Sequence, residues 1–159
     1  MNFWKQFRPK ACSVRLEAAR KDDALAELVD NLVSGGVLEA ARRSAALDAL
    51  LLREQSGSTG VGMNVAIPHV KLDGITRTAC SLSIHAKGIE WQAIDGGLVH
   101  IVFTVLRPSK AGAQHDPEQH LEMMRWIARL SRDADFRRFA LAVKTKTELV
   151  DLLKEKSAV

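Results

Sequence analysis

Apolar and polar positions alternate along this chain with two periods, one typical of strands and one typical of helices. Apolar residues occupy every second position from 14 to 18, which predicts a short, half-buried strand. Over residues 25–33 they recur at helical spacing, so a helix there would carry one apolar stripe. Gly35-Gly36 ends this helix, and a second helix, rich in alanine and leucine, is expected over about 40–54.

The middle of the chain has the pattern of a β-sheet. Residues 63–67 form a short apolar run that Pro68 ends. Residues 80–86 alternate between apolar and polar side chains, as in a strand with one wet face. Residues 98–106 are almost continuously apolar, which predicts a central strand covered on both faces.

The last third of the chain returns to a helical pattern. A loop is expected over 107–115, after which Asp116 and Pro117 begin a helix as its N-cap and first residue. Two further helices are expected near 134–143 and 146–156. Because helical and strand segments interleave, the sequence predicts an α/β fold: a mixed β-sheet flanked by helices.

Length and composition fit one domain over residues 1–159, since 47% of the chain is hydrophobic and 26% is charged. The net charge of +4 is mild and its basic residues are scattered, which gives no support to nucleic-acid binding. Two cysteines without a CxxC motif suit a reducing cytoplasm. No apolar segment approaches the ~20 residues of a membrane-spanning helix, and no signal peptide is apparent, so we expect a cytoplasmic protein that is not membrane-embedded.

The segment from Arg53 to His69 combines the groups that phosphoryl transfer requires. Arg53, at the end of the second helix, can bind an anion through its forked guanidinium. The glycine-rich loop 56–62 contains Ser58 and Thr59, whose hydroxyls, with the loop N–H groups, can donate to a phosphate. His69 follows the proline that ends the strand, and a neutral imidazole is a good nucleophile near pH 7. Together these groups suit a chemistry that depends on alignment and charge stabilisation.

In one-letter code the residues 53–69 follow the pattern RExxxSTGVGxxVAIPH. This pattern resembles the phosphorylation-site signature of phosphotransferase-system enzyme IIA domains of the fructose/mannitol type (type 2), a class that includes a nitrogen-regulatory member. The resemblance covers roughly residues 13–156 and leaves residues 1–12 outside as an amino-terminal extension. It implies a phosphotransferase that needs no cofactor. His69 would accept a phosphoryl group from phosphorylated HPr, or from its nitrogen-branch relative, and pass it to a IIB component.

The same resemblance implies roles for further residues. Arg53 matches the arginine near the phosphohistidine, and His120 matches a second histidine beside the active one. The resemblance also implies that Nε2 of His69 is the phosphorylated atom. Independently, His120 falls near the first turn of a predicted helix, where the helix dipole disfavours an imidazolium. A neutral His120 could donate one hydrogen bond, or its ring could simply pack at the helix edge. Val70 stands where the family usually has a small residue, and its branched side chain could narrow the site.

Other functions are compatible with parts of the sequence. The main alternative to sugar transport is regulation, in which a phosphate on His69 switches the binding of partner proteins. A metal site made of His115, Asp116, Glu118 and His120 is disfavoured, because the spacing is not that of HExxH. Nucleotide hydrolysis is disfavoured because no Walker lysine is present. We expect the aromatic amino-terminal residues to pack on the domain or fray, with membrane contact as the alternative.

Overall fold

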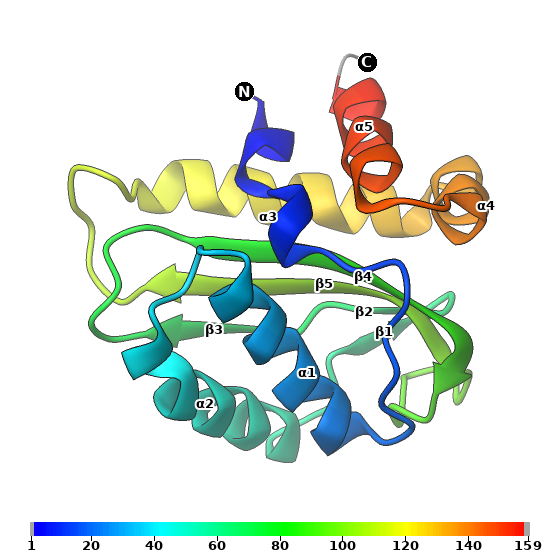
Figure 1. Ribbon diagram of the computed structural model, residues 1–159, viewed down its shortest axis with the longest axis horizontal. Coiled ribbons are helices and arrows are strands. Elements are labelled where there is room, and N and C mark those ends of the chain that lie inside the picture. Colours follow the sequence, from blue (N-terminus) through cyan, green and yellow to red (C-terminus); the bar gives the residue numbers. More distant parts are fainter. Residues whose placement is uncertain (1, 158–159) are drawn as a thin grey trace.

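The computed structural model describes residues 2–157, which form one mixed β-sheet with helices on both faces (Figure 1). Within these residues the strands are β1 (Gly60–Gly62), β2 (Val65–Ala66), β3 (His69–Leu72), β4 (Ala79–Ile89) and β5 (Val99–Pro108). The α-helices are α1 (Lys21–Ser34), α2 (Arg43–Gln55), α3 (Pro117–Arg132), α4 (Ala134–Ala142) and α5 (Lys146–Ser157). Short 3₁₀ helices lie at Phe3–Gln6, Pro9–Ala11 and Ala40–Arg42. The predicted α/β fold is confirmed.

β5 is the centre of the sheet, because β2, β3 and β4 all pair with it. β4 runs antiparallel along one edge of β5. β2 and β3 both run parallel along the other edge, where they pair with residues 101–102 and 105–108 respectively. The two short strands therefore act as one strand that is interrupted at Ile67 and Pro68. Proline has no N–H for the ladder, although the Pro68 carbonyl still accepts from the Val105 N–H at 3.0 Å.

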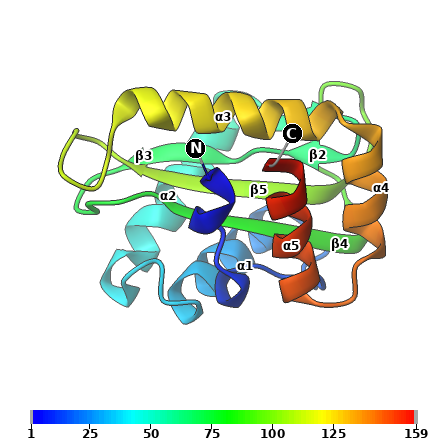
Figure 2. The ribbon, with the colours of Figure 1, turned by 90° about the horizontal axis from the view of Figure 1, so that it is seen from above.

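Helices cover both faces of this sheet. α1 and α2 lie against one face, whereas α3, α4, α5 and the amino-terminal residues lie against the other (Figures 1 and 2). α3 begins as predicted, with Pro117 as its first residue and the Asp116 side chain accepting from the Glu118 N–H. Asp133 caps α4 in a similar way, through the Phe136 N–H. These caps fix where α3 starts and where the chain turns into α4.

The central strand separates two hydrophobic clusters, because its side chains point alternately to the two faces. Ile101, Phe103 and Val105 pack in the cluster that includes α3, α4 and α5. Val102 and Leu106 pack in the other cluster, which includes α1 and α2. All of these side chains are buried. The continuous apolar run over residues 98–106 is therefore explained by burial on both faces, as predicted.

The strand predicted over residues 14–18 is absent, since within residues 2–157 this segment belongs to no named strand. It runs along the outer edge of β4, where Ser13 and Ser83 form an isolated bridge and the Leu16 N–H donates to the Ile84 carbonyl at 2.9 Å. Leu16 is only 4% exposed. The apolar alternation thus reflects burial against the sheet edge, with too few backbone bonds for a continuous ladder.

The apolar run predicted as one strand over residues 63–67 is divided by a turn. Met63 and Asn64 have φ angles of 56° and 66° and join β1 to β2 as a two-residue hairpin. Positive φ at both positions matches a type I′ turn, whose twist suits adjoining strands. The Asp95 carboxylate accepts from the Met63 N–H at 3.1 Å and holds this turn in place.

The amino-terminal residues pack on the domain, which confirms that expectation. The Phe7 side chain is 1% exposed, and its ring centre lies 6.2 Å from that of Phe103 and 6.0 Å from that of Trp126. Phe3 contacts the same tryptophan, at 5.9 Å between ring centres. Among residues 2–157, no helix combines the length and apolar character that crossing a membrane requires.

Candidate active site

His69 is the first residue of β3 and directly follows the break in the edge strand. Its side chain is exposed, and Nδ1 lies 2.7 Å from the backbone carbonyl oxygen of Ile67. A carbonyl oxygen only accepts hydrogen bonds, so Nδ1 must carry the proton. Nε2 then carries the lone pair. The local backbone therefore selects the tautomer with an unprotonated Nε2, the form that a nucleophilic histidine requires.

Two hollows meet at His69. The smaller, of 150 Å³, is lined by His69, Val70, Lys71, Val105, Arg107 and His120. The larger and shallower, of 650 Å³, is lined by Ala49, Leu52, Arg53, Gln55 and Ser56 together with His69, Val70 and Lys71. The structure thus brings both Arg53 and His120 to the walls of hollows that they share with His69. Val70 lines both hollows as well, although its side chain packs against the hydrophobic cluster that includes α1 and α2.

His120 lies in the first turn of α3, where its N–H donates to the Asp116 carbonyl at 2.9 Å. The side chain is half-buried, and its Nδ1 atom is enclosed without a hydrogen-bond partner among residues 2–157. Burial, followed by the charges of Arg107, His115 and His69, lowers the pKa of His120 to about 4. The ring is therefore neutral near pH 7. A neutral ring can donate one hydrogen bond to an anion without competing with His69 for a proton.

Arg53 lies in the last turn of α2, with its side chain half-buried. One guanidinium nitrogen, Nη1, donates to the Gly57 carbonyl at 2.7 Å, which orients the side chain. Within residues 2–157 no carboxylate pairs with it. The remaining donors of the fork are free to bind an anion at the hollow beside His69.

A family model matches almost the whole chain. The model for "Phosphoenolpyruvate-dependent sugar phosphotransferase system, EIIA 2" matches residues 5–156. The chain belongs to this EIIA family. The match begins at residue 5. It therefore includes part of residues 1–12, which the resemblance found in the sequence leaves outside.

Relatives of this EIIA chain include both a sugar-specific EIIA component and a nitrogen regulatory protein. It is 34% identical to the fructose-specific EIIA component of Haloferax volcanii over 86% of this chain and 84% of that protein. It is 35% identical to a nitrogen regulatory protein of Bradyrhizobium diazoefficiens over 80% of this chain and 78% of that protein. Its fold matches the Escherichia coli mannitol enzyme IIA, solved in complex with phosphorylated enzyme IIB, with a TM-score of 0.68 and 17% identity over 92% and 95% of the two chains.

Ser58 and Thr59 line neither hollow beside His69 in this EIIA chain. The Ser58 hydroxyl donates to the Trp91 carbonyl at 2.9 Å, and the Thr59 hydroxyl donates to the Glu54 carboxylate at 2.6 Å. The Thr59 hydroxyl holds the glycine-rich loop against the end of α2, and the Ser58 hydroxyl holds it against the residue that follows Glu90. The same loop accepts from Arg53 through the Gly57 carbonyl. Their direct contact with a phosphate stays a prediction.

Two cations beside His69 were not among the residues singled out from the sequence. Lys71 is two positions after His69 on β3, so both side chains project to the same side of the strand. Arg107 pairs with Lys71 in the β3–β5 register, because β5 continues to Pro108 instead of ending before the predicted loop. The alternation after His69 could have indicated Lys71. Arg107 could not be placed without knowing the register. No carboxylate lines either hollow, so the surroundings of His69 are cationic.

Proposed function

We propose that this EIIA chain is a phosphocarrier that accepts a phosphoryl group on Nε2 of His69. The hydrogen bond from Nδ1 of His69 to the Ile67 carbonyl carries the proposal, because it leaves Nε2 unprotonated at an exposed position. Arg53, Lys71 and Arg107 supply positive charge around a group that bears two negative charges. The neutral ring of His120 supplies a further donor.

The donor in this proposal is a phosphohistidine of HPr, or of its nitrogen-branch relative. Nε2 of His69 attacks the phosphorus atom as the bond from phosphorus to the donor nitrogen breaks, and the donor imidazole leaves with that electron pair. The proton on Nδ1 of His69 remains in its bond to the carbonyl, so no separate base is needed. The protein contributes alignment and charge stabilisation, which dominate phosphoryl transfer, and no cofactor takes part.

The acceptor is a IIB component in the transport version of this proposal. The relation to a fructose-specific EIIA component supports that version, and the mannitol IIA–IIB complex shows this fold bound to a IIB partner. The similar identity to a nitrogen regulatory protein supports the alternative, in which phosphorylation of His69 controls partner proteins. In both versions we place the protein in the reducing cytoplasm, because Cys12 and Cys80 are buried free thiols.

The decisive test is the intact mass of the protein after incubation with phosphoenolpyruvate, enzyme I and HPr. We expect one acid-labile phosphoryl group on the wild type and none on His69→Ala. The His69 side chain is exposed, so its removal should leave the fold intact, and circular dichroism checks this. Missing label on the variant would then report the loss of the imidazole itself. His100→Gln is a matched control, because His100 lies on β5 and lines neither hollow. Labelling of His69→Ala, or no labelling of the wild type by donors that label a known EIIA, would refute the proposal.

A further inference from the structure

A second pocket lies on the other side of His120 from His69. It has a volume of 260 Å³ and combines the amino-terminal residues, the segment before β4 and the beginning of α3. Its lining includes Lys5, Arg8, Arg77, His115, Gln119 and His120. We call it the amino-terminal pocket. His120 is the residue that it shares with the 150 Å³ hollow beside His69, so the two cavities adjoin at this side chain.

The amino-terminal pocket is strongly positive. Lys5, Arg8 and Arg77 line it, and none of them forms an ion pair among residues 2–157. Asp116 is the carboxylate in the lining, and its Oδ1 already accepts from the Glu118 N–H as the cap of α3. Three cations that line one pocket without ion pairs repel one another, and a bound anion would reduce this repulsion.

A histidine side chain also lines this space. His115 is 6% exposed and lines the pocket, yet within residues 2–157 its ring nitrogens have no hydrogen-bond partner. Its ring nitrogens are not among the fully enclosed polar atoms, so they are accessible at the wall of the cavity and can bond to a ligand there. The ring centre of His115 lies 5.7 Å from that of His120. A molecule that contacts His115 is therefore also close to the neutral histidine of the His69 site.

The shape of the pocket limits the size of its ligand. Its volume of 260 Å³ lies just below the range of about 300–1,000 Å³ that is usual for ligand pockets. That space suits a small metabolite and excludes a nucleotide. Gln119 and Thr78 add neutral polar groups beside the cations. Such a lining favours a compact molecule with several acidic oxygens.

We propose that the amino-terminal pocket binds a small organic anion that carries a phosphate group or two or more carboxylates. Arg8 and Arg77 bind its acidic oxygens, and His115 donates a hydrogen bond to it next to His120. The site is separate from the phosphorylation of His69, although the shared wall at His120 allows one to influence the other.

Calorimetric titration with citrate and with glycerol 3-phosphate tests this proposal, and glycerol serves as the neutral comparison. We expect saturable binding of at least one of the two anions to a single site and none of glycerol. Arg8→Gln and Arg77→Gln should each weaken binding about tenfold, the loss expected when one charge-assisted hydrogen bond is removed. Both side chains are exposed, so these variants should fold.

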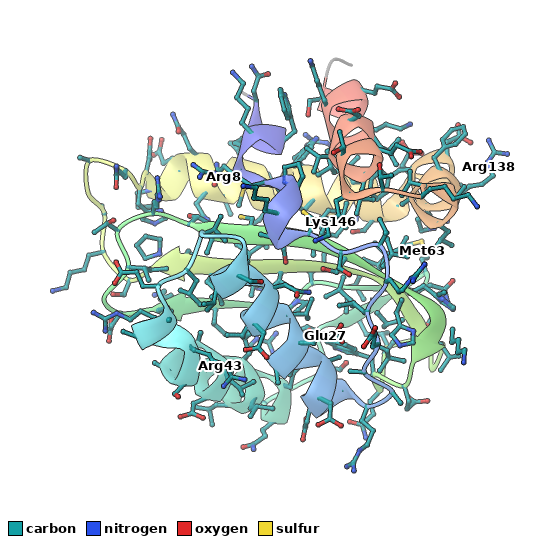
Figure 3. The ribbon with its side chains drawn as sticks, viewed as in Figure 1. Arg8, Glu27, Arg43, Met63, Arg138 and Lys146 are labelled. Atoms are coloured by element: carbon teal, nitrogen blue, oxygen red, sulfur yellow. The ribbon has the colours of Figure 1, made fainter. Side chains whose placement is uncertain are left out.

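Arg138→Gln is the matched control, because Arg138 lies on α4 at the right-hand end of Figure 3, away from Arg8, and does not line the pocket. Arg138→Gln and His69→Ala should both bind the anion with the affinity of the wild type. Binding to His69→Ala separates this proposal from the phosphocarrier function, which that variant lacks. The proposal is overturned if neither anion binds saturably to the wild type, if glycerol binds equally well, or if Arg8→Gln and Arg77→Gln retain wild-type affinity.

Discussion

Replacement of Glu54 by glutamine should destabilise the protein by about 3 kcal/mol, because one buried carboxylate holds three parts of the chain together. Its side chain is 6% exposed. It accepts from the Thr59 N–H at 2.9 Å, from the Thr59 hydroxyl at 2.6 Å and from Nε1 of Trp91 at 3.1 Å. Nζ of Lys21, on α1, lies 3.0 Å from the same carboxylate. The glycine-rich loop, Trp91 and the start of α1 thus meet at this group at the end of α2.

The magnitude follows from what glutamine cannot replace. The amide has no charge for Lys21, and its NH₂ group must face a donor that previously met an oxygen. Removal of one partner of a buried pair costs about 3–5 kcal/mol. The Lys21 side chain is 14% exposed, so water can reach it and the lower end of that range applies. For a domain of this size, 3 kcal/mol lowers the melting temperature by about 6–12 °C.

Urea unfolding followed by circular dichroism measures this loss. Asp30→Asn is the matched control, because Asp30 pairs with Arg43 on the surface, where the two side chains are 54% and 41% exposed (Figure 3 labels Arg43). Exposed pairs contribute about 0–1 kcal/mol, so the control should remain within 1 kcal/mol of the wild type. A loss below about 1 kcal/mol for Glu54→Gln would mean that the carboxylate does not join these elements.

Three further predictions concern the site and its support. Arg53→Ala should slow phosphorylation of His69 about a hundredfold, the usual cost of losing one donor to a developing charge, without preventing complete labelling at long times; a wild-type rate in rapid-quench assays would exclude its role. The C2 proton of His120 should titrate near pH 4 in NMR spectra. That pKa lies below the unfolded value of about 6.5, so the stability that neutral His120 provides is complete above pH 6.5 and is lost as the pH falls towards 4. In urea unfolding, His120→Asn should flatten this dependence of stability on pH. Gly35→Ala should destabilise the fold by about 1–3 kcal/mol, since a Cβ there would lie 2.6 Å from Cα of Ala11. Gly112 has open space around it, so Gly112→Ala should unfold at the same urea concentration as the wild type.

Local patterns predicted those parts of the structure that depend on neighbouring residues. The apolar run over residues 98–106 identified the central strand, and Asp116 with Pro117 identified the start of α3. The motif around His69 identified the nucleophile that we propose. In the first two cases the residues that decide the structure lie within one turn or one strand of each other.

Features that depend on distant partners could not be predicted. Met63 is not a residue that favours positive φ, and Asp95, 32 positions away, stabilises its turn. Arg107 reaches the site only because β3 and β5 pair in one particular register. Likewise, the Thr59 hydroxyl accepts from Nε1 of Trp91, 32 positions away, a partner that its place in a glycine-rich loop did not indicate. Sequence spacing does not determine such contacts.

The segment over residues 14–18 has a consequence for how this protein behaves at high concentration. β4 would otherwise present a long row of unpaired backbone groups along its outer side, and such an edge is a template for association between chains. Instead, the Ser13 N–H donates to the Leu82 carbonyl, the Leu16 N–H donates to the Ile84 carbonyl, and the Ser13 carbonyl accepts from the Ile84 N–H. A variant that begins after residue 17 would expose these groups together with the apolar surface beneath them. It would also lose the buried side chains of Phe7 and Leu16, so association between chains through β4 would accompany a weakened core.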